Sequence, residues 1–367
     1  MKVNTISLNS VRLNTIALNH IGEIRSGGGG SKPSPIPQWI REHVVFYYDV
    51  KKQGATNETL KESAYLQDLS DKGRRMKLNN FLFAEMSGVG GYNDNFLKWS
   101  SPSPYGNVEK LSSSEVVIKS LLGVQKGVLY IDLSIKAVHI KCHITGITKE
   151  IEGKFVFQYN KQGNKHIILK DGDFEFDSES LSLGSENGWV GFTTLEVIDN
   201  CNITITQIPE YPGALLTDGV DDYGLVENLS SGVKMLFMTV NPMASKRYLY
   251  DQRKDTSSPY AFAIVNHEGI IAYNSRNTDG KTYIDGILNT KLKTEDLLNK
   301  KQIITMLNSN VSESVTKQPV FWGSLSKIEN MKCAFYNSIA FDSIPTEADG
   351  FTEQELIDYV LTNIIGQ

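Results

Sequence analysis

The stretch His43-Val44-Val45-Phe46-Tyr47-Tyr48-Asp49-Val50 has the composition of a fully buried β-strand, because β-branched and aromatic residues follow one another without a helical spacing. From Trp39 onward the apolar residues keep mainly the spacing of strands, and turn residues rich in glycine and aspartate separate these strands. Short strands at such even intervals are typical of a sandwich. We therefore expect an all-β fold whose main body is a concanavalin-like jelly-roll sandwich.

The strand pattern is interrupted once, by the glycine-rich residues 87–93. A chain of 367 residues is longer than one domain with a single core usually is. A further set of short strands lies between the glycine-rich residues and residue 209. We predict an inserted second β-sandwich domain at 97–209 and a split jelly-roll domain at 39–96 and 210–367. Asp171-Gly172 and Asp218-Gly219 predict two-residue hairpin turns, since these residues accept positive φ cheaply.

One helix is expected, at the C-terminal end of the sequence. Thr352 and Glu355 have the spacing of a capping box, in which each side chain bonds to the other's backbone amide. Leu356, Tyr359, Val360 and Ile364 follow as an apolar stripe at helical spacing. The sequence therefore predicts an amphipathic helix packed on the sandwich.

The first 25 residues contain a five-residue repeat with an asparagine column, a β-branched column and a leucine column. The columns are Asn4, Asn9, Asn14 and Asn19; Ile6, Val11, Ile16 and Ile21; and Leu8, Leu13 and Leu18. A period of five would smear these columns around a helix and would swap faces on a flat strand. A short β-type coil, an extended arm buried by another chain, and a frayed terminus remain open. About four repeats can bury little apolar surface by themselves. We therefore interpret residues 1–25 as an anchoring arm that another chain covers.

A linker joins this arm to the body at residues 26–38. Four glycines, Gly27–Gly30, are followed by Pro33, Pro35 and Pro37. Glycines make a flexible joint and alternating prolines an extended, stiffer spacer. We therefore expect the linker to hold the arm away from the sandwich.

Five segments resemble the concanavalin-like, laminin-G-type jelly rolls of phage and surface proteins of gut Bacteroidales. They are Tyr65–Gly73, Thr217–Tyr223, Tyr283–Gly286, Cys333–Phe341 and Thr352–Glu355. They bracket the split jelly-roll domain, although residues 70–73 depart from the usual S-G-N-G and the long insertion is unusual. The arm resembles those of structural proteins of crAss-like and related gut phages. This resemblance implies a head or tail fibre or decoration protein, whose arm docks on capsid or tail proteins.

Composition narrows the range of partners. The formal net charge is −5, with 37 basic and 42 acidic side chains interspersed, so no cationic field for nucleic acid is present. No apolar run approaches the ~20 residues that a membrane-spanning helix needs, and no signal peptide is evident. Cys142, Cys201 and Cys333 lack the spacing of a metal site. We expect no cofactor, no metal, no nucleic acid and no membrane.

The strongest enzymatic candidate is the E-x-D-x-E motif of Glu175, Asp177 and Glu179. On one strand face, paired carboxylates about 5–5.5 Å apart would suit retaining glycoside hydrolysis. The alternation with Phe174 and Phe176 equally fits a strand that buries aromatics and exposes acids. We favour the structural interpretation, because the motif lies in the inserted domain.

Other polar groups have two interpretations each. Asp218, Asp221 and Asp222 offer oxygens to Ca²⁺, yet the set of ligands is incomplete and a solvated turn explains them. His139 and His143 share a strand face about 13 Å apart, which is too far for one ion. Aromatic platforms for a sugar are candidates by residue type alone. They are Trp99, Trp189, Trp322, Tyr248, Tyr250 and Tyr260.

The sequence therefore predicts a non-enzymatic virion protein that is assembled in the host cytoplasm. It would anchor by its arm, associate as a dimer or trimer, and contact host surface glycans through lectin-like sandwiches. The alternatives are a glycan-cleaving hydrolase that uses Glu175, Asp177 and Glu179, and a free carbohydrate-binding module.

Overall fold

The computed structural model describes residues 35–159, 165–185, 188–229, 231–244, 247–253, 263–267, 270–272, 280–289, 297–309, 315–324, 326 and 330–366. The predicted arm, with every column residue from Asn4 to Ile21, lies outside these residues, as does most of the predicted linker. The chain forms two compact units. Unit 1 takes in the chain up to Phe83, Ser87–Val89 and the chain from Gly213, and unit 2 takes in Ala84–Met86 and Gly90–Pro212.

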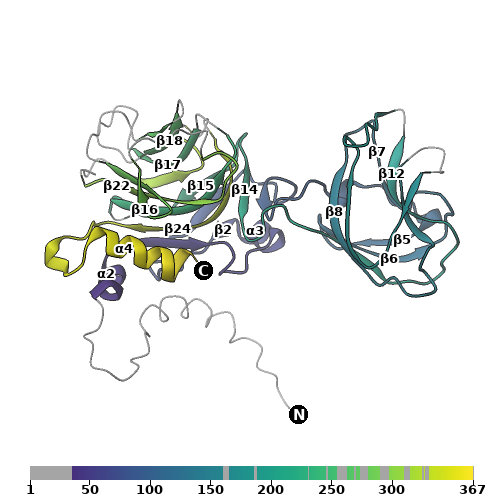
Figure 1. The fold of residues 1–367 in the computed structure, drawn as a ribbon, viewed down its shortest axis with the longest axis horizontal. Coiled ribbons are helices and arrows are strands. Elements are labelled where there is room, and N and C mark those ends of the chain that lie inside the picture. Colours follow the sequence, from purple (N-terminus) through teal and green to yellow (C-terminus); the bar gives the residue numbers. More distant parts are fainter. Residues whose placement is uncertain are drawn as a thin grey trace, which may run out of the picture. The chain divides into compact units, whose positions relative to one another are not determined.

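Unit 1 is a sandwich of two antiparallel sheets (Figure 1). In its described part, one sheet has eight strands: β1 Val44–Asp49, β4 Gly88–Val89, β14 Leu215–Asp218, β16 Met235–Pro242, β20 Lys281–Ile284, β21 Ile287–Leu288, β22 Gln302–Leu307 and β24 Lys332–Phe341. The other has seven: β2 Tyr65–Leu66, β3 Met76–Asn79, β15 Tyr223–Val226, β17 Arg247–Arg253, β18 Ala263–His267, β19 Ile270–Ala272 and β23 Val315–Phe321.

Strand β16 shows why the eight-stranded sheet is covered on both faces. Its residues are all buried, and successive side chains point to opposite faces. Leu236 and Met238 join the core between the two sheets. Met235 and Phe237 join a second apolar cluster on the opposite face, together with residues of two helices. Unit 1 therefore has three layers, a sheet, a sheet and a helical layer.

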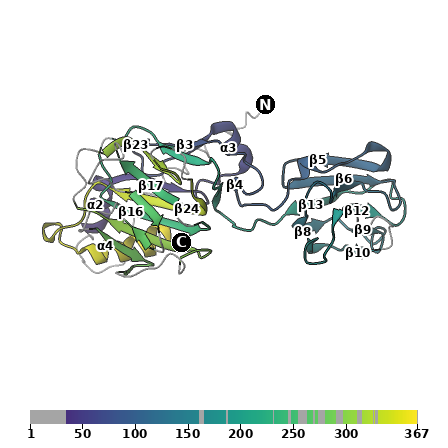
Figure 2. The same cartoon turned by 90° about the horizontal axis from the view of Figure 1, so that it is seen from above.

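The helical layer is made by α2 Pro35–His43 and α4 Glu353–Val360, which lie on the same side of the sheet (Figures 1 and 2). The capping box of Thr352 and Glu355 is confirmed, and Val360 and Ile364 are buried as predicted. Leu361–Ile365 continue α4 as a π-turn. Among the described helices, none is long and apolar enough to cross a membrane.

Unit 2 is a second antiparallel sandwich (Figure 2). Its four-stranded sheet holds β7 Leu129–Asp132, β9 Phe155–Gln158, β10 His166–Ile168 and β12 Trp189–Thr194. Its five-stranded sheet holds β5 Gly106–Lys110, β6 Glu115–Leu121, β8 His139–Thr145, β11 Gly172–Asp177 and β13 Ile203–Gln207. A core of its own lies between them, with Phe157, Phe192 and Ile205 fully buried.

The all-β sandwich prediction is confirmed, but several details of it are wrong. Pro35–Gln38, predicted as extended linker, begin helix α2, since proline is well suited to the first turn. The C-terminal helix is not the only described helix, because α2 and α3 Asn57–Ser63 are also present. Unit 2, Ala84–Met86 and Gly90–Pro212, contains the predicted insertion at 97–209.

Both predicted Asp-Gly hairpins are also wrong. The turn at Asp171-Gly172 joins β10 of one sheet to β11 of the other, and that at Asp218-Gly219 joins β14 to β15 across unit 1. Gly172 and Gly219 have φ of 121° and 77°, as the predicted turn chemistry requires. The positive φ fixes a tight turn but does not decide which sheet the following strand joins.

Candidate functional site

Of the E-x-D-x-E carboxylates, Glu175 lies within the edge strand β11, Asp177 ends it and Glu179 lies beyond it. Glu175 is exposed, and its Oε1 lies 3.2 Å from Nε2 of His139 and 3.6 Å from Nζ of Lys141 on β8. Asp177 ends the strand and accepts a 2.9 Å hydrogen bond from the backbone N–H of Glu179. Glu179 is therefore in a turn, and the three carboxylates do not line one strand face as the hydrolase hypothesis requires.

The aromatic side chains between these acids point inward. Phe174 and Phe176 pack on Phe157, with ring centroids 5.1 and 4.6 Å apart. The acids of β11 point the other way, toward solvent. Asp173 Oδ1 lies 2.7 Å from Nδ1 of His143, the residue that pairs with it on β8. The two histidines thus contact different carboxylates, and on this face acids of β11 lie opposite histidine and lysine side chains of β8.

The acidic cluster of unit 1 occupies the crossover between β14 and β15. Carboxylate oxygens of Asp218, Asp221 and Asp222 lie within 4.8 Å of one another. Asp218 Oδ1 accepts the backbone N–H of Val220 at 2.7 Å, and Asp222 Oδ2 accepts that of Asp218 at 2.9 Å. These bonds are those of a side-chain-stabilised turn.

Asp222 differs from the other two acids because it is fully buried. Its side chain also bonds to Ser87, while Oδ1 has no partner among the described residues. Desolvation raises the pKa of Asp222 to about 7. Three carboxylates fall short of the six to eight oxygens that Ca²⁺ takes, so the structure fits a turn better than a cation site.

Most of the predicted sugar platforms are core residues. Trp99, Trp322 and Tyr250 are at most 1% exposed, and Tyr260 lies outside the described residues. Trp189 is half-buried and packs on Tyr130, with ring centroids 5.4 Å apart. Tyr248 is half-buried beneath Arg253, whose guanidinium carbon lies 4.9 Å from the ring centroid. Trp189 and Tyr248 are therefore the candidates with surface left for a ligand.

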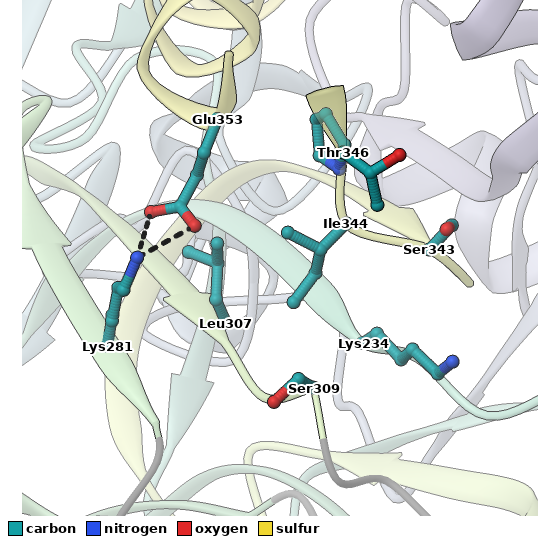
Figure 3. A pocket seen from close by; sticks show the side chains of 9 residues that line it. Lys234, Lys281, Leu307, Ser309, Ser343, Ile344, Thr346 and Glu353 are labelled. Carbon is teal, nitrogen blue, oxygen red and sulfur yellow. Dashed lines mark hydrogen bonds and ion pairs between the residues drawn. The ribbon is translucent and has the colours of Figure 1, made fainter. Parts of the chain in front are cut away.

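A cavity of about 380 Å³ opens at one end of the eight-stranded sheet of unit 1 (Figure 3). Strand register brings its walls together, because Leu307 at the end of β22 pairs with both Met235 of β16 and Lys281 of β20. The loop after β24 and the start of α4 complete it. The lining residues are Lys234, Lys281, Leu307, Ser309, Ser343, Ile344, Pro345, Thr346 and Glu353.

One wall of this cavity carries a fixed ion pair. Lys281 Nζ lies 3.1 and 3.0 Å from Oε1 and Oε2 of Glu353, and the Tyr283 hydroxyl donates to Glu353 Oε1. Glu353 is the first residue of α4, which the Thr352 capping box holds in register. Two donors and the helix start therefore fix this carboxylate in place.

The opposite wall carries an ammonium without such a counter-charge. Lys234 and Ser343 lie across the cavity from Lys281 and Glu353 (Figure 3). Lys234 is half-buried, and its Nζ has no ion-pair partner among the described residues. Two ammonium groups against one carboxylate leave the lining positively charged. Leu307 and Ile344 supply apolar surface between the walls.

Sequence reasoning did not find this cavity. Its residues are spread from 234 to 353 and form no local motif. The one partial signal was the capping box, which fixed the start of α4 beside it. No family model, no curated protein and no solved structure matches the chain.

Proposed function

We propose that the chain is a virion structural protein of a gut-bacterial phage, a head or tail fibre or decoration protein. In this proposal the arm of residues 1–25 docks on capsid or tail proteins, and the two β-sandwich units are displayed for contact with a surface or glycan. The five-residue repeat, the glycine and proline linker and the resemblance to phage jelly rolls support it.

The observation that carries the proposal is the way the chain enters unit 1 after the linker. Ile36, Trp39 and Ile40 of α2 are at most 9% exposed and belong to the apolar cluster beneath the eight-stranded sheet. Trp39 packs on Phe341 and Phe351, with ring centroids 5.3 and 5.9 Å apart. A load that the linker passes on from the arm would therefore reach the sandwich core at the first turns of α2, as an anchor requires.

The surfaces of the two units support contact without turnover. On unit 2, Glu175 is engaged by His139 and Lys141, Asp177 accepts a turn amide, and Glu179 lies in that turn, off the strand. On unit 1, the cavity offers charged, hydroxyl and apolar groups of the kinds that hold a small polar ligand. We therefore place surface recognition in the cavity.

Particle incorporation tests the role of the arm. Tagged full-length chain and a variant lacking residues 1–25 are produced in cells that assemble the particles, and the particles are banded on a density gradient. We expect the full-length chain to band with the particles and the deletion variant to stay behind, with an unchanged thermal unfolding transition. A variant with an equally long Gly/Ser replacement of residues 26–34 is the control and should still be incorporated.

A second variant distinguishes docking through the repeat from non-specific adhesion of the arm. Substituting Ile6, Val11, Ile16 and Ile21 by serine removes one column of the repeat while it keeps the length and charge of the arm. We expect this variant to be lost from the particles. Incorporation of either the deletion or the column variant at the full-length level would overturn the proposal.

A further inference from the structure

We propose that the cavity lined by Lys234, Ser343 and the Lys281–Glu353 pair binds a carboxylate-bearing sugar, such as a uronate or sialate residue of an acidic glycan. The inference deepens the surface contact of the proposed function and rests on that function only for the source of the glycan. The binding chemistry itself rests on the residues that line the cavity.

The size of the cavity limits the ligand. A volume of about 380 Å³ is at the lower end of the range for small-molecule sites, about 300–1,000 Å³. Its walls are the ends of β22 and β20, the residue before β16, the loop after β24 and the first turn of α4. A site of this size accepts one or a few rings and excludes a folded partner.

The charge of the lining selects an anion. Glu353 is already neutralised by Lys281 at 3.0 Å and by the Tyr283 hydroxyl. Lys234, on the opposite wall, is therefore the group that can form a charge-assisted hydrogen bond to an incoming carboxylate. The half-buried position of Lys234 reduces the screening that weakens exposed ion pairs.

The neutral residues favour a sugar over a simple anion. Ser309 and Ser343 offer hydroxyls that both donate and accept, which matches the hydroxyls of a sugar ring, while the Thr346 hydroxyl donates to Asp349. Leu307, Ile344 and Pro345 offer apolar surface for the C–H face of the same ring. Inorganic phosphate would use the ammonium groups and leave this apolar surface unused.

Calorimetric titration of the full chain with glucuronate and with N-acetylneuraminate tests the inference, and methyl glucoside serves as the neutral probe. Lys234→Met removes the ammonium of the wall opposite Glu353 but keeps the apolar stem, and it should weaken binding of both acids by about tenfold. Lys77→Met, at an exposed lysine of β3 in the other sheet, is the matched control and should change nothing.

A second variant should act in the opposite direction. Glu353→Gln removes the negative charge that neutralises Lys281, while its one amide oxygen can still accept the Tyr283 hydroxyl, so the acids should bind several-fold more tightly. Methyl glucoside should respond to neither variant. Thermal unfolding of each variant verifies that unit 1 is folded.

Three results would overturn the inference. They are the absence of millimolar binding by either acid, equal effects of Lys234→Met and Lys77→Met, and competition by phosphate as effective as that by glucuronate. None of them bears on particle incorporation through the arm, so the inference and the proposed function can fail separately.

Discussion

Two buried carboxylates of unit 1 have opposite surroundings. Asp251 is paired with Arg253, whose Nε and Nη2 lie 2.6–3.1 Å from the carboxylate oxygens, and these bonds raise the pKa of Arg253. Asp222 is equally buried but has backbone and hydroxyl partners and no cation. Burial without a counter-charge favours the protonated acid, so Asp222 should make stability depend on pH near neutrality.

Asp222→Asn should reveal this dependence. The folded carboxyl has a pKa of about 7, above the ordinary value of 3.8, so the folded chain holds the proton to higher pH than the unfolded chain does. The free energy of unfolding of the wild-type protein therefore falls as pH rises from about 4 to about 7 and is then level. The amide cannot ionise. The free energy of unfolding of the variant, relative to that of the wild type, should therefore rise over that interval by at most about 4 kcal/mol.

The measurement is urea unfolding of both proteins at pH 5 and pH 8, and the comparison cancels the titration of all other groups. Asp221→Asn, at the exposed neighbour, is the control and should show no such gain. A stability difference between Asp222→Asn and wild type that is the same at both pH values would contradict the prediction.

Calcium gives the same cluster an independent test. A cation bound only by the folded chain raises stability in proportion to the logarithm of its concentration over its dissociation constant. If Asp218, Asp221 and Asp222 serve as a turn, 5 mM CaCl₂ should leave the midpoint of thermal unfolding unchanged. A rise that Asp222→Asn abolishes would instead establish a calcium site, and an equal rise with MgCl₂ would indicate ionic strength.

At the scale of elements, α2 is held to the sandwich through one face. Trp39 is 4% exposed and fills the space between Phe341 and Phe351. Trp39→Ala should lower the free energy of unfolding of unit 1 by about 3–5 kcal/mol, because it leaves a large cavity. Gln38→Ala removes only an exposed contact with Glu42 and should cost at most about 0.5 kcal/mol. Denaturant unfolding measures both, and similar losses would mean that α2 is not docked.

The elements that the sequence failed to predict have physical explanations. Ile36, Trp39 and Ile40 have helical spacing, but the prolines around them resembled a spacer. Strand β23 contains Pro319, which cannot donate to a ladder and which argues in the sequence against a strand at this place. The buried run of β1 was predicted because residue composition and spacing agree there. The cavity could not be predicted, because only long-range register brings Lys234, Lys281 and Glu353 together.

At the scale of the molecule, unit 2 is an insertion between two paired strands of unit 1. Val89 of β4 pairs with Leu215 of β14, and Gly88 pairs with Leu216. The pairing continues into the connections, where Tyr211 N–H donates to Gly90 and Glu210 N–H donates to Gly91. Asn57 holds β4 through a 2.7 Å bond to the Val89 amide. The chain therefore leaves unit 1 and returns to it at neighbouring positions of one ladder.

This geometry predicts that the insertion can be removed. Replacing residues 90–212 by a short Asn-Gly turn should close the β4–β14 ladder as a hairpin, because the two ends are already opposite each other. Each unit has its own core, since the clusters around Trp322 and Trp39 contain no unit 2 residue. The shortened chain should therefore keep the circular dichroism of a folded β protein and a cooperative unfolding transition.

A separately produced 90–212 fragment should show an unfolding transition of its own. Phe157→Leu, in the core of unit 2, should lower the midpoint of this transition. Phe237→Leu, in the helical-layer cluster of unit 1, is the matched change for the shortened chain. In the full chain the two substitutions should each move a different calorimetric transition. A single transition moved by both, or a shortened chain that does not fold, would mean that unit 1 needs its insertion.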